Sequence, residues 1–210
     1  MFHMKQKWGK FHVKQNINFS KTLHQKLQMF ETLLKKWQKA VNLVSNNSLD
    51  SLWERHILDS AQLFAHIPEG AETLVDLGSG GGFPGLILAL MAQDAGRPLH
   101  VHLVESDTRK CAFLQEVCHQ LAIPASVHHC RIEDMPAFPA DVITARALSD
   151  LPTLLSLSRA FWKPSTHALF LKGSRVQDEL ARVPTGWTYQ LLPSQTDPSG
   201  IIVDIRKENA

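Results

Sequence analysis

A dense group of glycines in the segment LVDLGSGGGFPG, residues 74–85, is the part of the sequence best suited to bind a small molecule. Glycine has no Cβ atom, so Gly78, Gly80 and Gly82 can take positive φ angles and let a ligand approach the backbone closely. Pro84 suits the first turn of a following helix, whose free N–H groups can face an anionic or polar ligand. The segment therefore predicts a nucleotide-like cofactor site rather than a purely structural turn.

The choice of cofactor depends on one acidic residue. Gly80, Gly82 and Gly85 also satisfy the G-x-G-x-x-G fingerprint of dinucleotide binding, which is a weak signal alone. Asp76, two residues before the first glycine, makes the segment resemble the first motif of class I S-adenosylmethionine methyltransferases. An acidic residue there can hold the amino-acid end of that cofactor, directly or through water, whereas NAD has no ammonium group to satisfy. We therefore expect S-adenosylmethionine.

The hydrophobic pattern predicts the elements that position these residues. Two amphipathic helices come first, at 20–41 with Ser20 as its N-cap and at 49–65. Strands then alternate with helices, which implies a mostly parallel, doubly wound sheet. The expected strands are 73–77, 99–104, 126–130, 141–145, 167–172, 187–192 and 200–206, and the expected helices are 84–93, 107–121 and 150–162.

This pattern predicts an α/β fold with an N-terminal helical extension. We expect a basic tail and helical extension at residues 1–66 and the cofactor-binding domain at 67–210. At 210 residues, the chain is long enough for one such domain and a short appendage.

Ligands of such sheets bind beyond the carboxyl ends of the strands. Glu105 follows the second strand, where its carboxylate can accept hydrogen bonds from ribose hydroxyls or simply lie exposed. Ile132 follows the third strand and can cover an adenine face. Arg146 follows the buried fourth strand and is expected to point into the cleft, because a buried charge is costly. Lys172, after the fifth strand, fits a cleft residue and a plain strand-end charge equally well.

His56 and Asp59 lie three residues apart on the second expected helix. One interpretation places this helix beside the cleft, with His56 orienting the substrate or closing the site. The other is structural: the two side chains pair with each other or with Arg55 and hold the helix in place. The sequence leaves both open.

Six segments in a fixed order carry a resemblance that spans roughly residues 25–207. They are W-x4-NL-x-S (Trp37, Asn42, Leu43, Ser45), RHILDS (Arg55 to Ser60), DLGSGGGFPG, RIED, TARAL and LKG. The chain resembles the bacterial small-subunit ribosomal RNA methyltransferase G family, also called glucose-inhibited division protein B. The resemblance implies a class I, Rossmann-like fold with a seven-stranded sheet. It also implies methyl transfer from S-adenosylmethionine to N7 of one guanine in 16S rRNA, near the decoding centre.

The resemblance also assigns site residues. Carried over position by position, the family's cofactor contacts fall at Gly78, Phe83, Ile132, Glu133 and Arg146. Gly80, Gly82 and Glu105 fit the general class I pattern. Two positions depart from the family: Ile87 replaces a frequent proline, and Gln38 stands where many relatives have asparagine. Neither is expected to touch the reacting groups.

The expected methyl transfer requires no general acid or base from the protein. Guanine N7 has a lone pair and no proton, so no general base is required, and alignment can supply roughly 7–11 kcal/mol. No catalytic residue is certain, and Arg146 and His56 are the candidates. Arg146 is expected to bind guanine O6, a phosphate or the cofactor carboxylate. The 11 histidines are scattered, and we expect no metal.

The uneven charge distribution is typical of a surface that binds a polyanion. Residues 1–50 carry nine lysines and two acids, a net +7, while the rest of the chain carries −5. The alternative is a solvated lysine-rich helix face. The three cysteines form no C-x-x-C motif, and we expect a reducing cytoplasm, no signal peptide, no membrane span and a monomer.

Two other function classes remain open. A non-catalytic RNA-binding assembly factor with the same fold would retain cofactor binding without methyl transfer. An NAD-dependent oxidoreductase would need a catalytic Tyr-Lys or His-acid pair, and the sequence offers none with convincing spacing.

Overall fold

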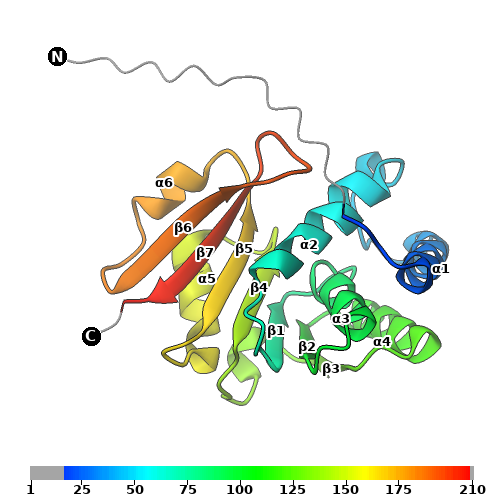
Figure 1. Ribbon diagram of the computed structural model, residues 1–210, viewed down its shortest axis with the longest axis horizontal. Coiled ribbons are helices and arrows are strands. Elements are labelled where there is room, and N and C mark those ends of the chain that lie inside the picture. Colours follow the sequence, from blue (N-terminus) through cyan, green and yellow to red (C-terminus); the bar gives the residue numbers. More distant parts are fainter. Residues whose placement is uncertain (1–16, 209–210) are drawn as a thin grey trace.

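The computed structural model describes residues 17–208, which form a seven-stranded sheet with helices on both faces (Figure 1). The strand order is β3-β2-β1-β4-β5-β7-β6, and β7 runs antiparallel to the other six strands. The strands are β1 Thr73–Leu77, β2 His100–Glu105, β3 Ala125–His129, β4 Val142–Arg146, β5 His167–Lys172, β6 Trp187–Pro193 and β7 Ile201–Lys207. The expected mostly parallel sheet is confirmed.

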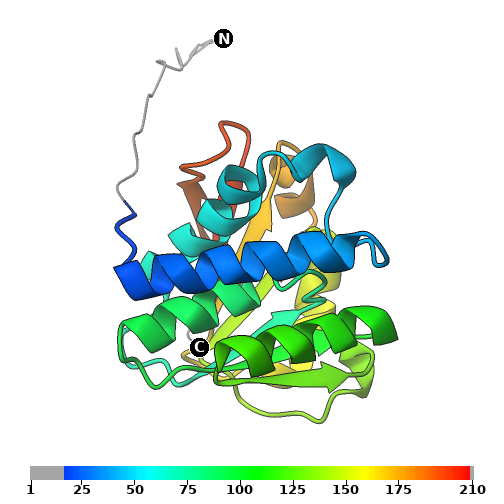
Figure 2. The ribbon, with the colours of Figure 1, turned by 90° about the vertical axis from the view of Figure 1, so that its right-hand side faces the viewer.

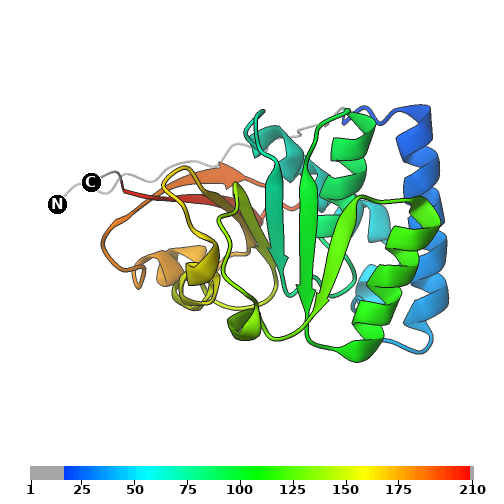
Figure 3. The same cartoon turned by 90° about the horizontal axis from the view of Figure 1, so that it is seen from below.

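The helices bury two separate apolar faces of the sheet (Figures 2 and 3). One face packs against α3 (Gly85–Asp94) and α4 (Thr108–Leu121), with α1 (Lys21–Gln38) lying across both. The other face is covered by α5 (Leu151–Leu157) and α6 (Val176–Leu180). The short helix α6 has no counterpart in the sequence prediction.

Helix α1 forms where its apolar residues recur every three or four positions. Leu23, Leu27 and Phe30 are buried, and the Ser20 hydroxyl caps the helix by accepting from the N–H of Leu23 at 3.0 Å, as expected. The Phe30 ring lies 6.3 Å from that of Phe113 in α4. The N-terminal helix therefore shares one core with the helices of the sheet, and the expected boundary after residue 66 stays a prediction.

The second expected helix is a helical segment of mixed type, and its hydrogen-bond pattern changes along its length. It contains a π-helix over Trp53–Leu58, the short α2 (Asp59–Ala61) and a 3₁₀-helix over Gln62–His66. π-Helical turns are rare and frequently occur at functional sites. This one carries Arg55 and His56, two residues of the RHILDS segment.

The glycine-rich turn connects β1 to α3. Gly78, Gly80 and Gly82 have φ angles of 67°, 54° and 87°, as the sequence predicted. Pro84 occupies the N-cap position, and α3 begins at Gly85.

Within residues 17–208, no helix is long and apolar enough to cross a membrane. The same part of the chain holds no cluster of three metal-ligating side chains. Most of the lysine-rich tail lies outside the described residues.

Candidate functional site

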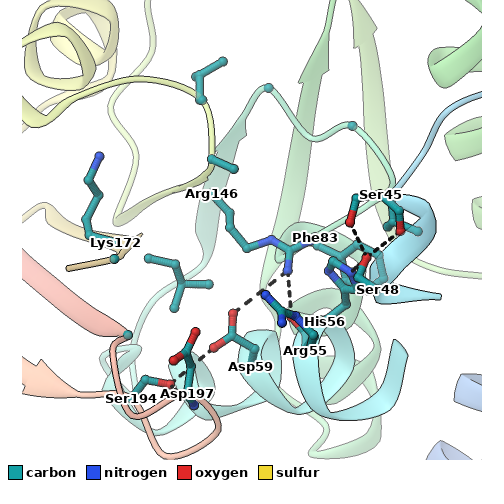
Figure 4. Close-up of a pocket in the computed structure, with 18 of the residues that line it drawn as sticks. Ser45, Ser48, Arg55, His56, Asp59, Phe83, Arg146, Lys172, Ser194 and Asp197 are labelled. Carbon is teal, nitrogen blue, oxygen red and sulfur yellow. Dashed lines mark hydrogen bonds and ion pairs between the residues drawn. The ribbon is translucent and has the colours of Figure 1, made fainter. Parts of the chain in front are cut away.

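A large open cavity, with a volume of about 1240 Å³, lies at the carboxyl ends of β1, β4 and β5 (Figure 4). Six segments far apart in the sequence contribute to its wall. They are the 43–48 segment, the helical segment with Arg55, His56 and Asp59, the glycine turn with Gly78, Gly80 and Phe83, the ends of β4 and β5 with the residues that follow them, and the β6–β7 loop with Ser194, Thr196 and Asp197. The cavity lies where a doubly wound sheet binds its ligands.

Arg146 is the central cation of this cavity. Its guanidinium lies over the ring of Phe83, 4.8 Å from the centroid, and donates to the Arg55 carbonyl oxygen at 3.2 Å. An Asp59 carboxylate oxygen lies 4.0 Å away. Burial lowers the pKa of Arg146 to about 10, so the side chain stays positively charged at neutral pH. Figure 4 shows the guanidinium directed at Asp59 and Arg55.

Asp59 connects this cation to the β6–β7 loop. Its carboxylate accepts from the Thr196 hydroxyl at 2.8 Å and from the Gln62 amide at 2.8 Å. Burial raises the pKa of Asp59, and the hydroxyl donors and Arg146 oppose that shift. Gln62, only 2% exposed, accepts from the backbone N–H of Gln195 at 2.9 Å. The loop is thus fixed at the cavity rim by two residues of the helical segment.

The His56 ring packs against Phe83, the aromatic side chain that lies under Arg146. Its ring lies 5.1 Å from that of Phe83, and its Nε2 forms a hydrogen bond with the Ser48 hydroxyl at 2.8 Å. Burial and the nearby charges of Arg146 and Arg55 lower the pKa of His56 to about 3. The ring is therefore neutral at physiological pH. The expected pairing of His56 with Asp59 or Arg55 is not what the structure shows, because Ser48 is its partner.

Replacement of His56 by glutamine is expected to make the fold less sensitive to acid. An unfolded histidine takes up a proton near pH 6.5, whereas folded His56 stays neutral down to about pH 3. Stability is therefore lost as the pH falls from 6.5 toward 3, and glutamine removes that contribution. Melting temperatures at pH 4.5 and 7.5 measure the effect. His119→Gln, at an exposed position of α4, is the control. Identical pH dependence in wild type and His56→Gln would contradict the expectation.

Asp76 lies beneath the cavity rather than in its wall. It is fully buried, and its two carboxylate oxygens accept from the Thr144 hydroxyl at 2.7 Å and from the Gly85 N–H at 3.2 Å. Burial raises its pKa to about 6. In this structure the side chain anchors the turn to β4 and α3. A direct or water-mediated contact with the cofactor's amino-acid end stays a prediction.

Glu105 joins the ends of β1 and β2. Its carboxylate accepts from the backbone N–H groups of Gly80 at 2.9 Å, Ser106 at 2.7 Å and Asp107 at 2.8 Å. The side chain is largely buried, so the alternative of an exposed strand-end acid is wrong. Glu105 does not itself line the cavity, and a contact with a ribose stays a prediction.

Four other expected site residues lie apart from the cavity wall or are held by internal pairs. Ile132 and Glu133 belong to a 3₁₀-helix after β3 and do not line the cavity. Gly82 is buried within the glycine-rich turn and does not line the cavity either. Lys172 lines the cavity, but its ammonium group donates to the Ser149 carbonyl at 2.7 Å and pairs with Glu179 at 2.7 Å. It points away from Arg146 (Figure 4), so the structure favours a strand-end charge.

Most of the chain matches one known protein family. Residues 23–198 match the family described as rRNA small subunit methyltransferase G. The chain belongs to this family. Similar members of the methyltransferase G family include proteins named ribosomal RNA small subunit methyltransferase G from Rhodospirillum centenum and Parvibaculum lavamentivorans. The first is 52% identical over 180 residues, 85% of this chain and 81% of the relative. The second is 47% identical over 194 residues, 90% of this chain and 85% of the relative.

Solved structures support the fold independently of close sequence similarity. A SAM-dependent methyltransferase from Aquifex aeolicus superimposes with a TM-score of 0.59 at 15% identity, covering 82% of this chain and 98% of that one. A putative S-adenosyl-L-methionine-dependent methyltransferase from Methanococcus maripaludis gives 0.59 at 13% identity, covering 93% and 98%. The predicted class I fold and membership in the methyltransferase G family are confirmed, and the NAD-dependent oxidoreductase interpretation is wrong.

Proposed function

We propose that the protein transfers a methyl group from S-adenosyl-L-methionine to N7 of a specific guanine in 16S rRNA near the decoding centre. The observation that carries the proposal is that the glycine turn and Arg146 open onto the same cavity in a member of the methyltransferase G family. We further propose a cytoplasmic monomer, in which residues 67–210 form the cofactor-binding domain and the basic residues 1–19 contribute to RNA binding.

The residues present fit this cofactor. The left-handed backbone of Gly78 and Gly80 lines the cavity without side chains, which suits close approach by a nucleoside. The Glu105 carboxylate offers acceptors for ribose hydroxyls, and the Arg146 guanidinium offers a partner for a carboxylate. Phe83, whose ring lies under the Arg146 guanidinium, provides an apolar surface in the cavity wall. Ile132 and Glu133 would need to approach from the end of β3 to contact an adenine.

The protein's part in the reaction is alignment. S-adenosylmethionine supplies an electrophilic methyl group when bound. Because guanine N7 has no proton to lose, the neutral His56 is not needed as a base. The stack of Arg146, Phe83 and His56 fixes one wall of the cavity, and a rigid wall orients the base. Orientation of this kind is worth roughly 7–11 kcal/mol.

The direct test supplies labelled S-adenosylmethionine and small ribosomal subunits from cells that lack this activity. Digestion of the RNA and mass spectrometry then identify the labelled nucleoside. We expect 7-methylguanosine. Label in another nucleoside would contradict the target atom, and cofactor binding without label would favour the non-catalytic assembly factor. A His56→Ala variant with full activity and a lower melting temperature would assign that residue a structural role.

Removal of residues 1–19 is expected to weaken RNA binding and to flatten its dependence on salt. This segment carries four lysines and no acid, and each lysine that neutralises a phosphate adds roughly 0.7–0.9 to the slope of log K against log salt. The slope should fall by up to about 3. Binding of 16S rRNA measured from 50 to 300 mM salt (roughly the range over which such affinities change strongly) provides the test.

A full-length control separates charge from length. Replacing Lys5, Lys7, Lys10 and Lys14 by glutamine should reproduce the effect of the truncation. Unchanged binding across the salt series in both variants would contradict the prediction.

A further inference from the structure

Leu148 is a large apolar side chain that lies exposed in the wall of a cavity lined by many charged and polar groups. It is 39% exposed, although most leucines of the described chain are buried. Only Met29 and Tyr189 are comparably exposed large apolar residues in residues 17–208. Single exposed leucines are common on protein surfaces, and Leu148 differs from them in the backbone that presents it.

The residue before it has an unusual backbone. Ala147 has a φ angle of 52°, in the left-handed region that non-glycine residues rarely adopt. Within residues 17–208 the other such residue is Ala122, which caps the C-terminus of α4, an ordinary place for it. No helix ends at Ala147. Its conformation follows directly after β4 and Arg146, and such strain persists where the surroundings fix it, often at ligand sites.

The position of Leu148 relates it to the cofactor site. A Cβ atom built on Gly78 would lie 2.8 Å from the Leu148 Cδ1 atom, so this leucine packs against the backbone of the first glycine. Two residues earlier, Arg146 is held on Phe83. Beyond Leu148 the chain continues along the cavity wall through Ser149 and Asp150. Leu148 therefore lies between the glycine turn and the remaining part of the cavity.

The cavity has room for a second occupant. Its volume of about 1240 Å³ exceeds the 300–1,000 Å³ typical for one drug-sized ligand. Enzymes that modify a nucleic-acid base take it out of the stack and hold it against aromatic or apolar side chains. Leu148 offers such a surface beside the proposed methyl donor site, while the neighbouring groups are charged or hydroxylic.

We propose that Leu148 is a substrate-contacting residue: its methyl groups pack against the face of the purine to be methylated and keep water from the reacting atoms. This inference rests on the proposed function, because it assumes that the second occupant is a base of the RNA substrate. The strained backbone of Ala147 holds the side chain in place before the base arrives.

The kinetic test uses Leu148→Ala in the full-length protein with small ribosomal subunits. Loss of the apolar contact is expected to lower kcat/KM on the order of tenfold, while the Kd for S-adenosylmethionine changes by less than about twofold. The kcat/KM of Leu148→Met should stay within about threefold of the wild-type value, because methionine conserves the volume of the side chain. Met29→Ala, which trims an exposed apolar side chain on α1, should change neither quantity. Unchanged kcat/KM, or a loss matched by the loss of cofactor affinity, would overturn the proposal.

A binding measurement distinguishes this proposal from the function on which it rests. Methyl-labelled protein saturated with S-adenosylhomocysteine is titrated with 5′-GMP or 5′-CMP, and the Leu148 methyl resonances are followed by NMR. Larger shifts with GMP support the proposal even if the wild type forms no 7-methylguanosine. Equal or absent shifts overturn it even if 7-methylguanosine forms.

Discussion

Replacement of Arg146 by lysine is expected to lower kcat/KM for methyl transfer by about ten- to a hundredfold, although the positive charge is kept. The guanidinium makes several contacts at once: it covers the Phe83 ring at 4.8 Å, donates to the Arg55 carbonyl at 3.2 Å and faces Asp59. A compact ammonium group cannot stack on the ring and reach both partners. Hydrogen bonds to charged groups contribute about 1.5–3 kcal/mol, which corresponds to the expected loss.

Two measurements distinguish a contact of Arg146 with the cofactor from a contact with the RNA substrate. Calorimetry gives the Kd for S-adenosylmethionine, and single-turnover rates on saturated enzyme give the remaining effect on transfer. A loss confined to Kd would assign Arg146 to the cofactor carboxylate, and a loss confined to the rate would assign it to the guanine or a phosphate. Arg206→Lys, an exposed guanidinium on β7, is the control. Wild-type values for Arg146→Lys would contradict a role in either contact.

Much of the scaffold follows from local sequence patterns. The expected strands match β1 to β7 within one residue, and β1, β2, β4, β5 and β7 are largely apolar and mostly buried segments. The rule that ligands bind at strand ends predicts that Gly78, Glu105 and Arg146 lie near one another. The structure brings these three residues to the same edge of the sheet.

The remaining features depend on contacts between distant residues. Gln62 is buried because it accepts from the N–H of Gln195, 133 positions later, and no local pattern indicates this pairing. Asp76 does not line the cavity, and its carboxylate instead accepts a hydrogen bond from the Thr144 hydroxyl on the neighbouring strand. Helix α6, with five residues, is too short to show a hydrophobic period. Such features are set by tertiary packing and could not be predicted from the sequence.

Gly85→Ala is expected to lower the free energy of unfolding by about 2–3 kcal/mol, because of overpacking in the core. A Cβ atom at this first residue of α3 would overlap Leu103 Cδ2 and lie 2.7 Å from Asp76 Oδ2 and 2.9 Å from Asp76 Cβ. Leu103 and Asp76 are both fully buried, and Asp76 is also held by Thr144, so neither side chain has space to move away. Alanine favours helices over glycine by up to about 1 kcal/mol, and here the steric overlap outweighs that gain.

Gly70→Ala provides the matched control, because a Cβ atom there has no heavy atom within 4 Å and its φ angle is not in the left-handed region. Urea denaturation should therefore give Gly85→Ala a lower free energy of unfolding than Gly70→Ala, and the difference should equal the full packing penalty. A displacement of α3 that relieves the steric overlap in Gly85→Ala would also weaken cofactor binding, since the Gly85 N–H and the Asp76 carboxylate together hold the glycine turn against β1. Equal stability of the two variants would mean that α3 can move away from β2, and the rigid turn on which the cofactor site depends would then be refuted.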